Sequence, residues 1–221
     1  MKRGEVERYL GHFFEASLFA MFLLGLANDD LYAAFSALFG LGMAMIPWFL
    51  KRERILVVPF ELTLWIFFAL FLHNLGILAK FYDTVWWWDK LTHFLSTSLI
   101  ATFGFVGIVI IDKYVDSIDL PPRFLPFFII VFVGTMGVFW EIIEFTLDKL
   151  LGTSMQYSLS DTIMDLVFDI FAGFIVAVLG PLYLRYRPVD DIVEEMKVGR
   201  VFEQILDRTT ESDQNGKVVL K

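Results

Sequence analysis

The sequence predicts an all-α, polytopic membrane protein, a bundle of six transmembrane helices followed by a short cytoplasmic C-terminal helix. Of its 221 residues, 57% are hydrophobic and 25 are phenylalanine, which argues against both a disordered chain and an ordinary soluble domain. Six apolar stretches of about 20 residues or more follow one another and leave no polar face for water. They cover residues 8–27, 31–50, 55–79, 86–111, 124–147 and 160–184.

Composition also excludes several classes of function. The chain has no cysteine, so disulfide scaffolds, thiolate zinc sites, iron–sulfur sites and cysteine nucleophiles are ruled out. A net charge of −8 argues against nucleic-acid binding. The chain contains no His-Glu-x-x-His zinc motif, no P-loop and no Gly-x-Ser-x-Gly elbow. The partner that the composition itself predicts is the lipid bilayer.

The topology follows from lysine and arginine. Ten of these residues flank the spans on one side and three on the other, in an alternation that holds through all six spans. Cytoplasmic loops carry an excess of Lys and Arg, so both termini are predicted to be cytoplasmic in a multi-pass protein of the cell membrane. Trp86, Trp87 and Trp88 then mark the outer interface, where indole rings favour the headgroup level.

The C-terminal tail differs from the rest of the chain. A six-span domain is predicted over residues 1–187 and a cytoplasmic tail over 188–221. Pro188 ends the last span, and an aspartate just after it caps a helix over about 190–208 that carries a rough apolar stripe. This helix either packs beneath the bundle or binds a partner or the membrane surface. Residues 209–221 are predicted to be disordered.

Ionisable residues gather in the outer halves of three spans. Their helical offsets place each set on one face, and a rise of about 1.5 Å per residue puts the three sets at matching depths. The third span adds His73 and Asn74 near its outer end. We therefore expect one convergent outer pocket. The three sets are Asp89, His93 and Ser96; Glu141, Glu144 and Asp148; and Asp161, Asp165 and Asp169.

The charge of this pocket predicts a bound cation. So many carboxylates in a low-dielectric setting cannot all be ionised and unpaired. We place Lys90 and Lys149 at the outer edge, where they could pair with Asp148 or Asp161, and no lysine or arginine lies at the depth of the carboxylates. Two resolutions remain, which are protonation of some carboxylates or a bound cation. Carboxylate oxygens with an imidazole suit a divalent metal ion such as Zn²⁺, Mn²⁺ or Mg²⁺.

Each residue has a predicted role and a structural alternative. Asp161 could simply cap the sixth span, Asp148 could pair with an interfacial lysine, and the whole set could be a stabilising polar network. A second set near the cytoplasmic side is read as anchors or as stations of a transport path. It comprises His12, Glu15 and Glu61, with Arg8, Arg52 or Arg54 as partners. In the outer set, the predicted metal ligands are Asp89, His93, Glu141, Asp165 and Asp169, the acid–base residues are Glu144 and Asp161, and the supporting residues are His73, Asn74, Ser96 and Asp148.

Three ordered motifs carry a resemblance to a known family. They are Trp88-Asp-Lys-Leu-Thr-His93, Trp140-Glu-Ile-Ile-Glu-Phe145 and the Asp-rich run from Asp161 to Asp169. Together they resemble the YjdF-like family of small polytopic inner-membrane proteins, over roughly residues 60–180. The resemblance implies the six-span fold and brings no assigned reaction. A shorter resemblance links the first and last motifs to VanZ-type proteins.

Three functions remain open from the sequence, and whether the protein is an enzyme stays undecided. The first is a metal-dependent enzyme that acts on a lipid or lipid-linked substrate near the outer headgroups. The second is a cation or proton-coupled transporter that binds an ion transiently at the same carboxylates. The third is a non-catalytic membrane module for assembly or regulation, in which the acidic cluster is a stabilising network.

Overall fold

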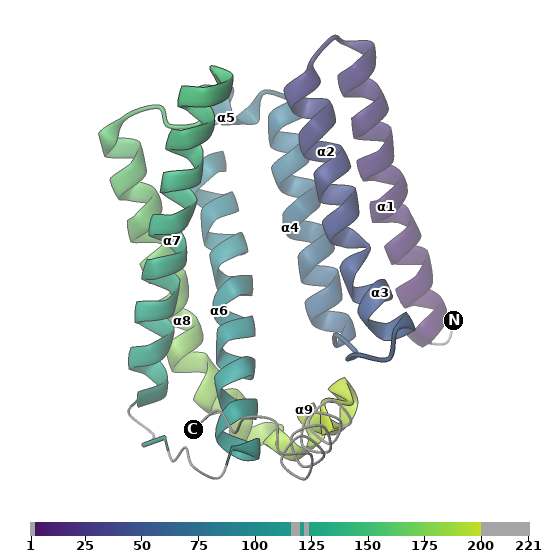
Figure 1. The fold of residues 1–221 in the computed structure, drawn as a ribbon, viewed down its shortest axis with the longest axis vertical. Helices are drawn as coiled ribbons and strands as arrows, with labels where there is room; N and C mark the ends of the chain where they lie inside the picture. Colours follow the sequence, from purple (N-terminus) through teal and green to yellow (C-terminus); the bar gives the residue numbers. More distant parts are fainter. Residues whose placement is uncertain (1–2, 116–119, 122–123, 200–221) are drawn as a thin grey trace, which may run out of the picture.

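A computed structural model describes residues 3–115, 120–121 and 124–199 of the chain. The described residues form helices joined by short connections, and six spans are long and apolar enough to cross a membrane, with α2 and α3 together making the second (Figure 1). This confirms the predicted all-α, six-span fold. The helices are α1 (Arg3–Ala27), α2 (Leu31–Ala44), α3 (Ile46–Arg52), α4 (Phe60–Leu78), α5 (Phe81–Thr84), α6 (Trp88–Tyr114), α7 (Phe124–Leu151), α8 (Leu159–Tyr186) and α9 (Val189–Met196).

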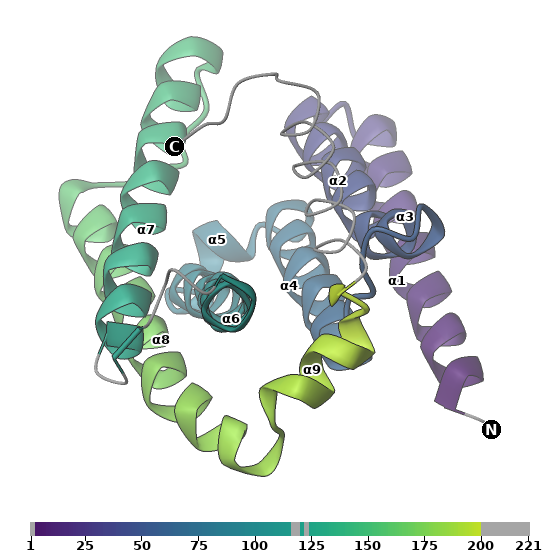
Figure 2. The same cartoon turned by 60° about the horizontal axis from the view of Figure 1, so that its bottom comes forward.

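The long helices form two groups of three. Helices α1, α2 and α4 pack against one another, as do α6, α7 and α8, and α4 contacts α6 to join the groups. Figure 1 shows the groups side by side, with α5 at one end of the bundle, and Figure 2 shows α9 running across the opposite end from α8 toward α4. We call these two ends the α5 end and the α9 end.

The first group is held by small residues at its helix contacts. A Cβ atom on Gly25 of α1 would lie 2.6 Å from the backbone nitrogen of Ala34 on α2, so the two backbones touch there. Ala33 and Ala37 are buried on the same helix. Membrane helices associate through such close packing because lipid offers no hydrophobic driving force between them. The turn between α1 and α2 is tight, and Asp29 adopts a left-handed conformation in it.

The second span is broken, which the apolar pattern over 31–50 did not predict. Helix α2 ends at Ala44 and α3 begins at Ile46, with Pro47 in the first turn of α3. Proline has no backbone N–H and its ring collides with the carbonyl four residues earlier, so a continuous helix is interrupted here. Both pieces still follow one path across the bundle (Figure 1).

The second group also depends on glycine at its closest contacts. A Cβ on Gly173 of α8 would lie 2.5 Å from Val133 Cγ2 on α7. A Cβ on Gly137 of α7 would lie 2.5 Å from Asp169 Oδ2 on α8. These contacts bring α7 against α8 and press the glycine face of α7 directly onto an acidic residue.

One contact at the α5 end joins the two groups, and a second ties α2 to the connection after α4. A Cβ on Gly76 of α4 would lie 2.2 Å from Trp88 Nε1, so the indole at the start of α6 lies against the α4 backbone. Asp30 caps α2 by accepting from Ala33 N, and its other oxygen lies 2.8 Å from Lys80 Nζ. This lysine lowers the pKa of Asp30 below its usual range.

Helix α9 closes the α9 end. Its side chains Ile192, Val193 and Met196 are buried against residues that include Ile110 of α6 and Leu56, which precedes α4. The backbone of the same region is tied by a 2.8 Å hydrogen bond from Val57 N to Met196 O. Of the two interpretations of the tail helix, packing beneath the bundle is therefore the observed one.

The helix predicted over about 190–208 is interrupted at Lys197. It begins at Val189 after Pro188 and ends at Met196, because Lys197 adopts a left-handed conformation that no continuing helix allows. Ion pairs Lys113–Asp190 and Arg187–Glu195 fix its position. The remainder of the helix predicted to reach about residue 208, and the disorder predicted for 209–221, fall outside the described residues.

Large apolar side chains cover the outward surface of both groups. Phe35 and Phe39 of α2 and Phe127 of α7 are each more than 60% exposed in the isolated chain. Exposed apolar surface of this extent is not stable in water and is the natural contact with lipid tails. The bilayer is therefore the immediate surrounding of these helices, while the cytoplasmic location of the termini remains a prediction from the lysine and arginine counts.

Candidate metal centre

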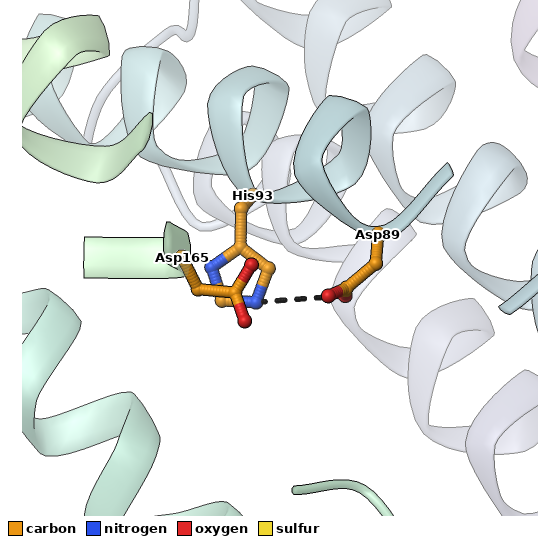
Figure 3. A group of neighbouring side chains, drawn as sticks. All are labelled: Asp89, His93 and Asp165. Atoms are coloured by element: carbon orange, nitrogen blue, oxygen red, sulfur yellow. Dashed lines mark ion pairs between the residues drawn. The ribbon is translucent and has the colours of Figure 1, made fainter. Parts of the chain in front are cut away.

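The first two turns of α6 and α8 meet at the α5 end and bring three candidate ligands together. Asp89 and His93 lie one helical turn apart on α6, and Asp165 reaches them from α8 (Figure 3). One ligand atom from each lies within 4.8 Å of the others. His93 Nε2 is 3.8 Å from Asp89 Oδ1. Of the five predicted ligands, these three form the one group of metal-binding spacing among the described residues.

The three groups are largely shielded from water. Asp165 is 2% exposed as a residue, and the side chain of His93 is 9% exposed. Burying an ionised carboxylate is costly unless a positive partner lies close by. Such a partner is present, and it is Lys90.

Lys90 lies inside the acidic cluster, and this corrects the expectation that it lies at the edge. Its Nζ atom lies 2.8 Å from Asp89 Oδ2 and 3.0 Å from Asp165 Oδ1, and it also pairs with Asp161 Oδ1. The lysine side chain is 15% exposed. The pair with Asp161 was expected from the sequence, whereas the pair with Asp165 was missed because spacing leaves the rotation of each helix about its axis undetermined.

Asp169 holds the imidazole rather than joining the group of three. Its Oδ1 lies 3.3 Å from His93 Nδ1 and accepts a 2.6 Å hydrogen bond from the Thr97 hydroxyl. A carboxylate only accepts, so His93 Nδ1 carries the proton and Nε2 is left free to bind on the side of Asp89. Metal-ligating histidines are commonly oriented by a carboxylate in this way. Thr97 was not predicted, although its position one turn after His93 was available as a sequence signal.

Glu141 lies on α7, outside the group of three, with one oxygen in use. Its Oε2 accepts a 3.0 Å hydrogen bond from Gln156 Nε2, whereas its Oε1 is buried and has no hydrogen-bond partner among the described residues. Gly137 touches Asp169, and α7 runs antiparallel to α8. One turn along each helix leads to Glu141 and Asp165, so these residues lie at the same level. Gln156 stands in the α7–α8 loop, where helical periodicity gives no indication of it.

Glu144 is the second buried acid of α7. It is 8% exposed, and its Oε1 accepts a 2.8 Å hydrogen bond from Trp140 Nε1 on the same helix. It lies near enough to Glu141, His93 and Asp89 for their charges to act on it. Glu144 therefore borders the centre without belonging to the group of three.

Asp161 and Asp148 have structural partners of their own. Asp161 lies in the first turn of α8, where Ser158 caps the helix by accepting from Asp161 N, and its side chain pairs with Lys90. Asp148 accepts hydrogen bonds from Thr153 Oγ1, Met155 N and Gln156 N, which folds the α7–α8 loop back onto the helix end. The lysine pair predicted as the alternative for Asp148 is thus replaced by loop contacts.

The predicted supporting residues of α4 face different neighbours. His73 Nδ1 lies 2.8 Å from the Tyr82 hydroxyl, which donates to Thr92 Oγ1 on α6. His73 is therefore linked to α6 through Tyr82, a residue that the sequence did not single out. Burial raises the pKa of Tyr82 above its usual range. Asn74 faces α2 instead. Its Nδ2 donates to Leu70 O on its own helix and lies next to Gly40 of α2.

The second polar set does not form one cluster. His12 Nδ1 lies 3.3 Å from Glu15 Oε2 on the same helix, so the partner of Glu15 in the structure is His12 rather than one of the predicted arginines. Glu61 acts instead on Arg187, whose pKa is raised chiefly by its hydrogen bond to the Tyr183 hydroxyl and further by Glu61. No continuous polar path from this set to the centre is visible in the described part of the chain.

The fold and this centre define an α-helical membrane protein with a buried His/Asp/Lys cluster. The chain belongs to the family described as "Predicted membrane protein (DUF2238)", whose model matches residues 10–186. An uncharacterized protein from Thermotoga maritima is 31% identical over 147 residues, which is 66% of this chain and 68% of the relative. These matches confirm the resemblance to the YjdF-like family. No solved structure matches the chain.

Proposed function

We propose that the protein binds a divalent cation at Asp89, His93 and Asp165 and is a metal-dependent enzyme acting on a lipid or lipid-linked substrate. The observation that carries this proposal is the convergence of two carboxylates and one imidazole from two helices, with ligand atoms within 4.8 Å of each other. Two oxygens and one nitrogen form a donor set that suits Mn²⁺ or Zn²⁺ better than Ca²⁺. Three ligands also leave coordination positions for a substrate.

The charge balance supports a cation at this place. Six carboxylates lie in or next to the centre, and within the described residues at most two positive charges, those of Lys90 and a protonated His93, oppose them. Glu141 adds an independent observation, because its buried Oε1 has no hydrogen-bond partner among the described residues. A buried carboxylate oxygen without a partner is costly, and a nearby cation would satisfy it.

The position of the centre supports a lipid substrate. Asp89 lies in the first turn of a membrane-crossing helix, close to the end of the span. Trp86 and Trp87, which precede that helix, are exposed in the isolated chain, and tryptophan side chains of this kind favour the headgroup level. A headgroup at this level would come within reach of the three ligands.

The residues suggest a division of chemical work. A divalent cation would supply Lewis-acid polarisation of a phosphoryl or acyl oxygen of the headgroup. Glu144 would take a proton from water or from a substrate hydroxyl, since it borders the centre and is not among the acidic partners that Lys90 has in the described part of the chain. Asp161, the other predicted acid–base residue, is less suited to this role because Lys90 holds its side chain.

Metal analysis of the purified protein tests the binding step. The wild type, purified in detergent without a chelator and analysed by plasma mass spectrometry, should contain about one divalent ion per chain, since the described residues form one group of three. His93→Ala and Asp165→Asn should lose it. Asp190→Asn is the matched control, because Asp190 lies at the α9 end and is bonded to Lys113. A wild type free of divalent metal contradicts the proposal.

Turnover of membrane lipids tests the enzymatic step. Protein reconstituted with Mn²⁺ and a total lipid extract should produce a new lipid species by mass spectrometry. Glu144→Gln should keep the metal and slow product formation by roughly 10²–10⁴-fold, as expected for loss of a general base. Metal-dependent ion flux in liposomes without lipid turnover would favour the transporter. Metal binding with neither activity would favour the non-catalytic module.

A further inference from the structure

The function proposed above gives Lys90 no role in metal binding, although this lysine lies inside the acidic cluster. Lys90 Nζ lies 2.8 Å from Asp89 Oδ2 and 3.0 Å from Asp165 Oδ1. Both aspartates are candidate metal ligands, so the ammonium lies among the very oxygens that a divalent cation would use. An ammonium and a divalent ion sharing two carboxylates repel each other strongly where water is excluded.

The third partner of Lys90 gives it a second position. Asp161 pairs with Lys90 and lies one helical turn from Asp165, toward the α5 end. It is absent from the group of three ligand atoms. Its side chain is 19% exposed, whereas that of Asp165 is 3% exposed. A flexible lysine can therefore leave Asp89 and Asp165 and remain paired with Asp161.

The exchange favours ions of higher charge. A monovalent ion that displaced the ammonium would bring no more charge to the two carboxylates than Lys90 already supplies. A divalent ion doubles the charge at the same oxygens, and the ammonium keeps its pair with Asp161. The competition thus opposes Na⁺ and K⁺ more strongly than it opposes Mn²⁺ or Zn²⁺.

We infer that Lys90 is a built-in competitor of the metal ion, which occupies Asp89 and Asp165 in the cation-free protein and moves to Asp161 when a divalent cation binds. Lys90 thereby sets both the affinity of the centre and its preference for divalent over monovalent ions. This inference rests on the proposed metal site and specifies how that site is regulated. It also assigns Asp161 the role of holding the displaced lysine rather than that of an acid or base.

Titration with Mn²⁺ tests the competition, because free Mn²⁺ gives an electron paramagnetic resonance signal that falls on binding. Lys90→Met removes the charge and keeps much of the side-chain volume, so it should bind Mn²⁺ roughly tenfold more tightly than the wild type, within the usual range of coupling between sites. Addition of 0.3 M KCl should weaken Mn²⁺ binding more in Lys90→Met than in the wild type. Lys149→Met, which removes a lysine lying over the Phe145 ring near the same end of the bundle, should leave Mn²⁺ affinity within about threefold of the wild-type value.

A second variant keeps the inference testable if Lys90→Met does not fold. Asp161→Asn removes the resting place of the lysine, so it should bind Mn²⁺ roughly tenfold more weakly than the wild type. Equal Mn²⁺ affinity in the wild type, Lys90→Met and Asp161→Asn would overturn the competition and leave the metal site standing. Absence of Mn²⁺ binding in all three proteins would overturn both the metal site and the competition.

Discussion

The two groups of helices have the same architecture and bury very different side chains. The group of α1, α2 and α4 has a core of alanine, phenylalanine and leucine, with Asn74 as its buried polar residue among those described. The group of α6, α7 and α8 buries Glu141, Glu144, Asp165 and Asp169. Buried charges in a membrane protein are costly, so the contrast indicates that α6, α7 and α8 carry the function and that α1, α2 and α4 support the structure. Four substitutions test this division.

The largest loss of stability is expected at the centre of the second group. Asp165→Ala leaves Lys90 with one acidic partner fewer in a buried setting and should lower the free energy of unfolding by about 3–5 kcal/mol. Titration with SDS, followed by tryptophan fluorescence, measures this. Asp190→Ala is the control, because its side chain is 82% exposed and should change stability by less than about 1 kcal/mol. Equal losses in the two variants would count against the distinct role of the centre.

A substitution in the first group should cost stability without affecting the metal. A Cβ on Gly25 would lie 2.6 Å from the Ala34 nitrogen and 2.9 Å from its Cα, and a backbone contact of this kind is not relieved by a side-chain movement. Gly25→Ala should therefore cost about 1–3 kcal/mol in the same titration. Gly42→Ala has open space around the new atom and should be neutral or slightly stabilising. Loss of bound metal in folded Gly25→Ala would break the division between the groups.

Gly137→Ala, the equivalent substitution in the second group, should lower both the stability of the protein and its affinity for metal. A Cβ on Gly137 would lie 2.5 Å from Asp169 Oδ2, and the carboxylate would have to move away from His93 and Thr97. We expect a smaller loss of about 1 kcal/mol for Gly137→Ala, because a side chain yields more readily than a backbone. Mn²⁺ affinity should fall roughly tenfold, as it does when a metal-bound histidine loses its orienting carboxylate. Gly134→Ala, on the same helix with open space, should change neither quantity.

The smallest effect is expected at the contact between α2 and the connection before α5. Lys80 lowers the pKa of Asp30 below its ordinary value of 3.8, so the pair stabilises the folded protein above about pH 4 and loses its effect as acid protonates Asp30. Lys80→Met should cost roughly 0.5 kcal/mol at pH 7, a value typical of exposed ion pairs. Unfolding titrations at several pH values should show the gap between wild type and variant closing below pH 4. A gap that widens in acid would contradict this assignment.

The sequence predicted the fold better than the positions of the side chains. Bilayer thickness fixes the length of each apolar stretch, and for this reason the six spans were found within a few residues. The break at Met45 was missed because Pro47 does not interrupt the apolar pattern, although its missing N–H interrupts the helix. The end of α9 at Met196 was missed because a left-handed lysine leaves no mark in composition.

The candidate centre was predicted in its residue types and only in part in its contacts. Asp89 and His93 share a face by spacing alone, and depth brought Asp165 to the same level. Spacing could not say which way α8 is turned, so Lys90 was placed at the edge although it pairs with Asp165. Tyr82 and Gln156 lie in connections between helices, where no periodicity identifies them. Their contacts depend on tertiary packing.

The most direct test is the location of a bound metal. Crystals or grids of the wild type prepared with Mn²⁺ should show a metal peak, verified by anomalous scattering in the crystal, between Asp89, His93 and Asp165. At the same time the Lys90 side chain should lie on Asp161. A Mn²⁺-saturated map with no peak among these three residues, or with Lys90 still bridging Asp89 and Asp165, would contradict the account.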